Sequence, residues 1–297
     1  MNQSIFGGVE IGGSEIVCAI GTSPINILKE AIIPTRSPSE TIPEIIQFFN
    51  DQQNNYEKIS AIGIASFGPL DLNPRSQTYG QIIATPKSGW VGTDVIHPFR
   101  DALNIPVFLD TDVNGAALGE WLSGAGRGYH TILYMTVGTG IGVGAIVSGK
   151  ILYGSNHPEM GHMRIPHDFV NDPFIGICPF HGDCLEGLAS GHAMELRWLS
   201  RPENLPYNHP AWALEAQYLA YATTNLIFAF SPQRIILGGG IMRHLGLLKR
   251  IQRETNKLIN GYSNLGENEI NQILVEPMLG DRAGVCGAIG LAMQANQ

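Results

Sequence analysis

Over the first 35 residues, hydrophobic positions either alternate with polar ones or form short runs. Segments 5–13, 15–21 and 27–35 read "IFGGVEIGG", "EIVCAIG" and "ILKEAIIPT", and Gly-Gly-Ser or Ser-Pro sequences separate them. Short runs of this kind, bounded by glycine, serine and proline, are typical of β-strands. The amino end is therefore expected to form consecutive strands joined by tight turns.

Longer segments with apolar residues at helical spacing follow. Segment 39–53, "SETIPEIIQFFNDQQ", predicts a helix with Ser39 or Thr41 as its N-cap. An apolar strand is expected at 59–71, and "IPVFLDTDVNGAALGEWLSGAG" predicts a strand, a short turn and a helix. Further helices are predicted at 209–230, 245–260 and 284–296.

The opening pattern recurs later in the chain. "VEIGGSEIVCAIG" aligns with "TVGTGIGVGAIVSG" about 125 residues on, and "IGIASFGPL" is echoed by "RIILGGGIM". The repetition indicates two copies of one α/β unit, each opening with a β-hairpin around glycines. We expect a smaller domain at 1–113, joined by the helix at 284–297, and a larger one at 114–283 with an insertion at 155–190. A cleft between two such halves is a natural ligand site.

Net charge, the length of apolar runs and the cysteine count argue against several classes of function. The 297 residues carry a net charge of -8, which argues against sequence-independent nucleic-acid binding. No stretch reaches the roughly 18 apolar residues of a membrane span, and the first residues lack a signal-peptide pattern. Four cysteines in a chain of this size do not make a disulfide framework. A cytoplasmic protein that binds neither membranes nor nucleic acid is expected.

Three glycine patterns in the sequence could each be a phosphate-binding or nucleotide-binding motif. "GAIVSGKI" has P-loop spacing, but Ile151 stands where Ser or Thr is required, and two strands around a turn are expected there. "GTGIGVG" lacks the helix that a dinucleotide fingerprint needs. It better fits a hairpin whose backbone N–H groups approach phosphate, with Thr136 and Thr139 as hydroxyl donors. A merely tight hairpin is the alternative. "GGGIM" is either a turn against a nucleotide or only a turn.

Two acids end the strand predicted before residue 112. Asp110 and Asp112 would share one face if the strand continued through them. A carboxylate at such a strand end can accept a proton from a bound hydroxyl. Either aspartate could instead only cap the helix beginning near Asn114. Spacing alone leaves the two interpretations equal.

"ICPFHGDCLEG" contains a candidate metal site. Cys178, His181 and Cys184 have zinc spacing, and either His157 or His162 could supply a fourth ligand. Four protein ligands close a tetrahedral site, so such a metal would be structural. The alternative is a pair of free thiols beside surface histidines.

Together, these segments resemble the ROK family of repressors, open reading frames and sugar kinases over nearly the whole chain. "GVEIGGS" and "TVGTGIGVG" look like its two phosphate motifs, and "FLDTDVNGAALGE" looks like its catalytic segment. "HPEMGHM" and "CPFHGDCLEGLASG" look like its Glu-x-Gly-His signature and zinc loop, the latter in the fructokinase form. The resemblance implies a duplicated actin-like (ribonuclease H-like) fold. It also implies a homodimer that transfers the γ-phosphoryl group of ATP to a hexose with Mg²⁺.

The resemblance also implies roles for single residues. Asp112 matches the base that takes the proton of the attacking sugar hydroxyl, and His162 matches the fourth ligand of the structural Zn²⁺. The residues expected to contact the sugar are Gly68, Thr111, Glu159, His162 and Glu186. Those expected to bind the nucleotide are Gly12, Gly13, Ser14, Thr136, Gly138, Thr139, Gly140, Gly239 and Gly240.

The chain departs from the family pattern at three of its motif positions. Glu10 stands where many members have Asp, Glu15 replaces a frequent basic residue, and Thr111 replaces the usual Asn. Fructose is the expected substrate, with mannose, glucose or an amino sugar as alternatives. A ROK transcriptional regulator would need a DNA-binding domain before the first phosphate motif, which starts at about residue 7. A zinc-braced sugar-binding protein without catalysis is the remaining alternative.

Overall fold

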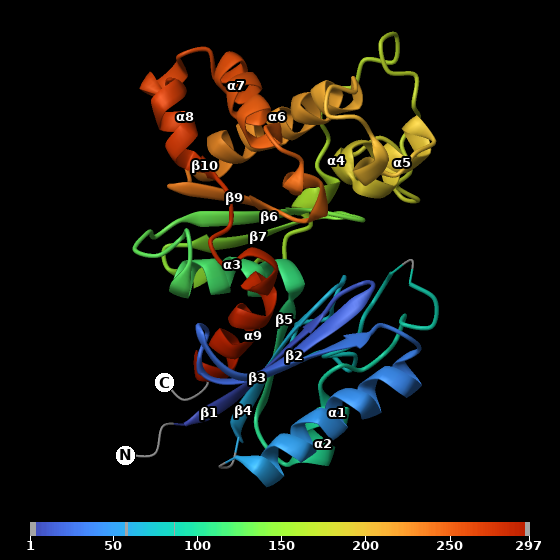
Figure 1. The fold of residues 1–297 in the computed structure, drawn as a ribbon, viewed down its shortest axis with the longest axis vertical. Coiled ribbons are helices and arrows are strands. Elements are labelled where there is room, and N and C mark those ends of the chain that lie inside the picture. The colour runs from blue at the N-terminus through green and yellow to red at the C-terminus, as the bar shows by residue number, and fades with distance from the viewer. Residues whose placement is uncertain (1–3, 57–58, 86, 295–297) are drawn as a thin grey trace. The chain divides into compact units, whose positions relative to one another are not determined.

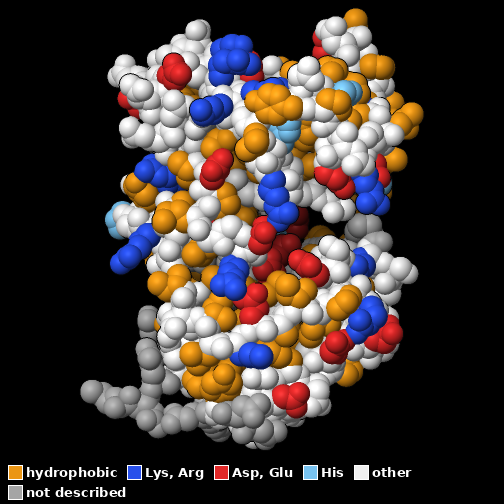
Figure 2. All heavy atoms as spheres, in the orientation of Figure 1, with side chains coloured by type: hydrophobic (Ala, Val, Ile, Leu, Met, Phe, Trp, Pro, Cys, Tyr) orange, Lys and Arg blue, Asp and Glu red, His pale blue; other side chains and the backbone are white. Residues whose placement is uncertain are grey.

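The computed structural model describes residues 4–56, 59–85 and 87–294 and divides into two compact units. Unit 1 takes in the described residues of Met1–Arg127, Ile151–His157 and Leu279–Gln297, and unit 2 takes in Gly128–Lys150 and Pro158–Met278. Within the described ranges, no helix is both long and apolar enough to span a bilayer. On the face drawn in Figure 2, Lys and Arg side chains are interspersed with acidic and apolar ones and form no single patch.

Unit 1 is a mixed sheet with helices on both faces (Figure 1). Its strand order is β3-β2-β1-β4-β5, antiparallel along β1, β2 and β3 and parallel along β1, β4 and β5. The strands are β1 (Ile5–Ile11), β2 (Glu15–Ser23), β3 (Asn26–Pro34), β4 (Ile59–Ser66) and β5 (Val107–Thr111). The helices are α1 (Pro38–Asn55), α2 (His97–Leu103), α3 (Asp112–Ser123), η5 (Gly280–Arg282) and α9 (Ala283–Gln294).

Apolar residues on both faces of the central strands form two cores. On one face, Ile42, Ile45 and Phe49 of α1 pack with the strands and with α2. On the other face, Val285 and Ile289 of α9 pack with small and aromatic strand residues. Strands covered on both faces explain the near-continuous apolar runs of β1 and β4.

Glycines let α3 approach α9 closely. A Cβ at Gly119 would lie 2.3 Å from the carbonyl oxygen of Ala283, and one at Gly287 would lie 1.7 Å from that of Gly115. Since no side chain fits at these distances, the two helices can pack only with glycine there. This packing fixes α3, which begins at Asp112, against the C-terminal helix.

Unit 2 repeats the same sheet. Its strand order is β10-β9-β6-β7-β8, antiparallel between β6 and β7 and parallel along β6, β9 and β10. The strands are β6 (Ile132–Val137), β7 (Ile141–Val147), β8 (Lys150–Ile151), β9 (Arg234–Gly238) and β10 (Leu274–Val275). The α-helices are α4 (Leu185–Ala189), α5 (Gly191–Trp198), α6 (Ala211–Phe230), α7 (Leu247–Ile259) and α8 (Glu267–Ile273). The 3-10 turns are η1 (Met160–His162), η2 (Pro202–Asn204), η3 (Gly240–Arg243) and η4 (Tyr262–Asn264).

The predicted duplication is confirmed. Strands β6, β7, β8, β9 and β10 occupy the places that β1, β2, β3, β4 and β5 hold in unit 1. The segment with P-loop spacing forms β7 and β8 around a turn in which Ser148 and Gly149 have φ of 52° and 75°. No helix follows it directly, so this segment is a hairpin.

Two local expectations differ from the structure. The N-cap of α1 is Ser37, not Ser39 or Thr41, because Pro38 takes the first helical position and Ser37 forms a capping box with Glu40. The contacts also group α3 with unit 1, although the sequence analysis assigned residues 114–123 to the second domain. The glycine-mediated packing on α9 accounts for this grouping.

Candidate functional site

The junction of β5 and α3 separates the roles of the two aspartates. The fully buried Asp110 carboxylate accepts hydrogen bonds from Thr111 N (2.7 Å), Asn114 Nδ2 (2.8 Å) and the Tyr153 hydroxyl. Thr111 is the N-cap of α3, with Oγ1 accepting from Asn114 N at 3.2 Å. Asp110 and Thr111 therefore hold the strand-to-helix turn together, and capping does not require Asp112.

Asp112 lies in the first turn of α3, after the strand has ended. Its Oδ1 accepts a hydrogen bond from Val113 N at 2.8 Å. Burial raises the pKa of Asp112 to about 6. The side chain is thus ionised at pH 7 while remaining a stronger base than an exposed aspartate, which suits a group that must accept a proton.

Glu10, on β1, is another carboxyl of unit 1, and its Oε2 atom is buried. A Cβ at Gly284 would lie 2.2 Å from Glu10 Cδ, which shows how closely this side chain meets the start of α9. Burial, and next the charge of Asp112, raise the pKa of Glu10 to about 8. Glu10 is therefore mainly protonated at pH 7 while Asp112 is ionised, and different environments separate the two carboxyls.

The first glycine turn connects β1 to β2. Gly12 N donates to the carbonyl of Glu15 at 3.1 Å, and Thr35 both donates its hydroxyl to Gly12 O (2.8 Å) and its N–H to Ser14 O (3.0 Å). A Cβ on Gly13 would meet nothing within 4 Å. The turn is thus rigid, with open space at its tip.

A lysine that sequence reasoning missed lies at this turn. The ammonium of Lys87 donates to the carbonyl of Gly13, although the two residues are 74 positions apart. The chain has Glu15 where family members frequently carry a basic residue. Lys87 therefore brings a positive charge to the turn from a distant loop, which a local motif could not reveal.

Gly68 lies in the loop after β4, close to a returning segment of the chain. The ideal Cβ of Gly68 would lie 3.9 Å from His157 Cε1. His157 is buried, and its Nε2 lies 3.1 Å from Leu70 N and 3.2 Å from Leu70 O. His157 is thus engaged with this loop of unit 1 and takes no part in the metal cluster described below.

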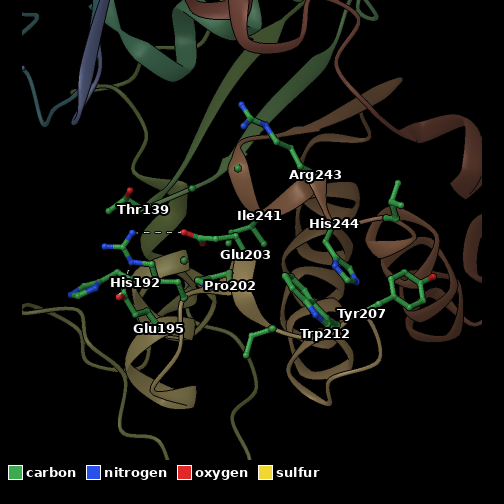
Figure 3. A pocket seen from close by; sticks show the side chains of 16 residues that line it. Thr139, His192, Glu195, Pro202, Glu203, Tyr207, Trp212, Ile241, Arg243 and His244 are labelled. Atoms are coloured by element: carbon green, nitrogen blue, oxygen red, sulfur yellow. Dashed lines mark ion pairs between the residues drawn. The ribbon is translucent and has the colours of Figure 1, made fainter. Parts of the chain in front are cut away.

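Unit 2 contains a pocket of about 740 Å³ (Figure 3). Gly138, Thr139 and Gly240 line it, together with residues of α5, α6 and the loop between them. A Cβ on Gly138 or on Gly240 would meet nothing within 4 Å. The protein itself therefore leaves room for a ligand to approach the backbone at these two glycines.

A stack of three rings forms one wall of the pocket, as Figure 3 shows. The His244 and Trp212 rings lie 3.7 Å apart at 7°, and the His244 and Tyr207 rings 5.2 Å apart at 29°. Burial and the charge of Arg250 lower the pKa of His244, so its ring is neutral at pH 7. The sequence alone gives no signal for this stack, because the three rings come together only in the fold.

Three other residues that were predicted to bind the nucleotide lie next to the pocket. Thr136 lies in β6, in register with Gly238. Gly140 lies against a carboxylate, with an ideal Cβ 2.7 Å from Glu186 Oε2, and Gly239 has φ of 93°. Thr136 thus lies in a strand, and Gly140 and Gly239 lie in turns, beside the pocket rather than in its lining.

Four candidate metal ligands gather in unit 2. His162, Cys178, His181 and Cys184 each offer one ligand atom, and these atoms lie within 4.8 Å of one another. His162 Nδ1 lies 3.5 Å from Cys184 Sγ and 3.7 Å from Cys178 Sγ, and His181 Nδ1 lies 3.5 Å from Cys178 Sγ. Tetrahedral zinc with ordinary bond lengths requires an N···S separation of about 3.6 Å. The ligand set and its spacing fit one zinc ion, with His162 rather than His157 as the fourth ligand.

The predicted sugar-binding residues of unit 2 adjoin this cluster. Glu159 is the exposed N-cap residue of η1, which ends at His162. Glu186 is the second residue of α4, whose N-cap is Cys184, and its Oε1 is 4.0 Å from His162 Nδ1. Its Oε2 accepts from Ile141 N at 3.0 Å. Two metal-ligand candidates, His162 and Cys184, thus lie in or next to η1 and α4, the same short elements that carry Glu159 and Glu186.

Comparison with known proteins agrees with this arrangement. Residues 6–295 match the model of the ROK family. The chain belongs to the ROK family. Among its ROK relatives, the fructokinase of Zymomonas mobilis is 42% identical over 299 residues, covering 99% of this chain and 98% of that protein.

Solved structures show the same fold. The ROK hexokinase of Thermus thermophilus has a TM-score of 0.80 at 24% identity, covering 98% of this chain and 99% of that one. The ROK glucokinase of Streptomyces griseus, solved with glucose and AMPPNP, has a TM-score of 0.75 at 24% identity, covering 99% and 100%. The predicted ROK fold class is therefore confirmed.

Proposed function

We propose that this ROK protein is a fructokinase that transfers the γ-phosphoryl group of ATP to the 6-hydroxyl of D-fructose. The observation that carries the proposal is the near full-length similarity to a fructokinase, at 42% identity. The raised pKa of Asp112, about 6, supplies a group suited to the proton transfer. ADP and fructose 6-phosphate would be the products.

In the proposed reaction, Asp112 accepts the proton of the attacking hydroxyl as its oxygen bonds to the γ-phosphorus. The bond between that phosphorus and the ADP oxygen breaks, and ADP leaves with the electron pair. Such transfer needs positioning and charge stabilisation more than covalent chemistry. The first turn of α3 holds Asp112, while Asp110 and Thr111 keep that turn in place.

The pocket of unit 2 suits the nucleotide. Its aromatic wall of Trp212, His244 and Tyr207 offers a surface for the base, and the open backbone at Gly138 and Gly240 suits phosphate oxygens. AMPPNP, bound to the Streptomyces griseus glucokinase, is an ATP analogue, which supports ATP as the nucleotide.

Mg²⁺, when bound with the nucleotide, would neutralise phosphate charge. The Glu10 Oε2 atom is buried without a hydrogen-bond partner, and a carboxylate oxygen is a ligand type that Mg²⁺ prefers. Glu10 is therefore the residue of unit 1 proposed to hold this ion, directly or through water, and it would lose its proton on doing so, because a carboxyl ligand must be ionised.

Zinc and sugar are assigned to neighbouring residues. We assign the zinc to His162, Cys178, His181 and Cys184, where it would hold the chain segments together without taking part in the chemistry. Glu159, Glu186 and the remaining ring nitrogen of His162 would bind sugar hydroxyls, and Gly68 and Thr111 of unit 1 stay predicted sugar contacts. The predicted homodimer stays a prediction, which sedimentation can test.

The first test measures ADP release by the purified protein with ATP and a panel of hexoses. We expect kcat/KM for fructose to exceed that for mannose, glucose and amino sugars by about tenfold or more, which corresponds to about 1.4 kcal/mol of differential transition-state binding. If kcat/KM were highest for another hexose, that hexose would be assigned as the substrate in place of fructose. Absence of ADP release with every sugar would refute the kinase assignment.

A second prediction tests the nucleotide pocket through Gly240→Ala. The new methyl group would occupy the open space at Gly240, so we expect KM for ATP to rise about tenfold, or about 1.4 kcal/mol. The melting temperature should not fall, because the methyl would enter open space rather than displace other parts of the protein. Gly239→Ala is the matched control: its φ of 93° and a Val137 oxygen at 2.4 Å predict lower stability instead. An unchanged KM for ATP in Gly240→Ala would place the phosphates elsewhere.

A further inference from the structure

A buried ion pair in unit 2 joins α5 to the chain segment that precedes α4. Arg197 Nη2 of α5 lies 3.2 Å from Asp172 Oδ2, and the two side chains are 7% and 6% exposed. The Tyr218 hydroxyl of α6 donates to the same Asp172 oxygen at 2.5 Å. Three separate parts of unit 2 thus meet at one carboxylate.

Two aromatic rings lie against the guanidinium of this pair. The guanidinium of Arg197 lies over the Phe174 ring at 4.4 Å and near the Tyr218 ring at 5.6 Å. Burial raises the pKa of Glu215 well above its ordinary value, and the charge of Arg197 acts in the opposite direction. Charges taken out of water in this way often add little net stability, and a role in fixing one conformation is the best-attested alternative.

The other terminal nitrogen of the Arg197 guanidinium contacts α4. Arg197 Nη1 donates to the Leu188 carbonyl at 2.8 Å. Helix α4 has only five residues, with the metal-ligand candidate Cys184 as its N-cap and Glu186 in its first turn. A helix this short has little stability of its own, so its position depends on such external contacts.

A histidine extends the same network to the other side of Cys184. His167 Nε2 lies 3.0 Å from the Asp172 carbonyl, and His167 Nδ1 lies 3.3 Å from Asp183 Oδ2. Asp183 directly precedes Cys184 and also accepts from Arg164. The chain on both sides of Cys184 is therefore connected to the Arg197–Asp172 pair.

We propose that Arg197 and Asp172 are positioning residues, whose buried ion pair holds α4 in place and thereby sets Cys184 for the metal and Glu186 for the sugar. Neither residue touches the metal cluster or the proposed substrate groups. The sugar part of this inference rests on the proposed function, whereas the metal part does not.

The test is a double variant, Arg197→Met with Asp172→Asn, which leaves neither charge buried alone. Asn keeps an oxygen to accept from Tyr218. In the zinc-loaded protein we expect zinc release to a chromophoric chelator to become about tenfold faster and KM for fructose to rise about tenfold, while KM for ATP stays within about twofold. Arg197→Lys keeps the charge and should restore part of both effects. If the double variant does not fold, Arg197→Lys alone, which keeps the charge but loses the planar fork that reaches Leu188, should change both quantities in the same direction by a smaller factor.

A matched control is Arg253→Met, which removes the exposed Arg253–Glu254 pair of α7, with its 3.1 Å contact, and should change neither quantity. Unchanged zinc release and unchanged KM for fructose in a folded double variant would refute the proposal. An equal rise in both KM values would also refute it, because it would indicate general loosening. If the wild-type protein did not phosphorylate fructose but the variant still released zinc faster, the proposed function would fail while the positioning of Cys184 would stand.

Discussion

Asp112→Asn is expected to lower kcat for fructose phosphorylation by about 10²–10⁴-fold, the usual contribution of a positioned general base. The amide has nearly the same shape as the carboxylate but cannot accept the hydroxyl proton. KM for ATP and for fructose should change little, because Asp112 acts on the reacting proton. Steady-state kinetics with ADP detection measures all three quantities. Near-normal turnover would show that Asp112 is not the base.

The pH dependence of the wild-type protein is a companion measurement. Burial raises the pKa of Asp112 to about 6. Because only the ionised form accepts a proton, kcat/KM should fall as the pH drops through about 6 and should level off above it. The acid limb should be absent from the residual activity of Asp112→Asn.

As the pH rises through about 6, activity should rise while the stability associated with Asp112 should fall. The folded-state pKa of Asp112 lies above its ordinary value of 3.8, so its ionisation opposes folding, and stability associated with this group is lost as the pH rises through about 6. Asn carries no charge, so Asp112→Asn should melt at the same or a higher temperature at pH 7. Asp110→Asn is the contrasting variant, because Asp110 accepts from Thr111, Asn114 and Tyr153. It should lower the melting temperature.

The elements and the duplication were predictable because they depend on local patterns. Glycine-bounded apolar runs marked β1, β2, β6 and β7, and the recurrence of these runs predicted two copies of one α/β unit. The matching strand order of the two sheets is visible only in the structure. The N-cap of α1 was misplaced by two or more residues because several hydroxyl side chains lie close together there. Only the capping box between Ser37 and Glu40 distinguishes among them.

The features that the sequence did not predict depend on contacts between residues that lie far apart in the chain. Lys87 reaches Gly13 from a loop, and the ring stack joins Trp212 of α6 to His244. The buried pair of Asp172 and Arg197 likewise carries no spacing signal. Spacing also left the two aspartates equal, and only their hydrogen bonds distinguish them. Asp110 is occupied by its partners, whereas Asp112 begins the helix.

Cys178→Ser is expected to release the zinc and lower the melting temperature by about 10 °C, equivalent to about 4 kcal/mol for a unit of this size. Serine is a poor ligand for zinc, and the remaining three groups cannot close the tetrahedron. The segment on each side of α4 would then lose its common anchor. Metal analysis of the purified variant and a thermal melt measure the two effects.

Cys18→Ser is the matched control, since Cys18 is a buried thiol of unit 1 remote from the four metal ligands in sequence. It should lose some stability through its apolar surroundings but retain its zinc. In Cys178→Ser we expect KM for fructose to rise with the loss of zinc, because Glu186 and His162 are then less well placed, while kcat at saturating fructose persists. If kcat instead collapsed while the fold and the fructose affinity were retained, the metal would be taking part in the chemistry. A structural role requires the first result, because a zinc ion with four protein ligands has no open position for a reacting oxygen.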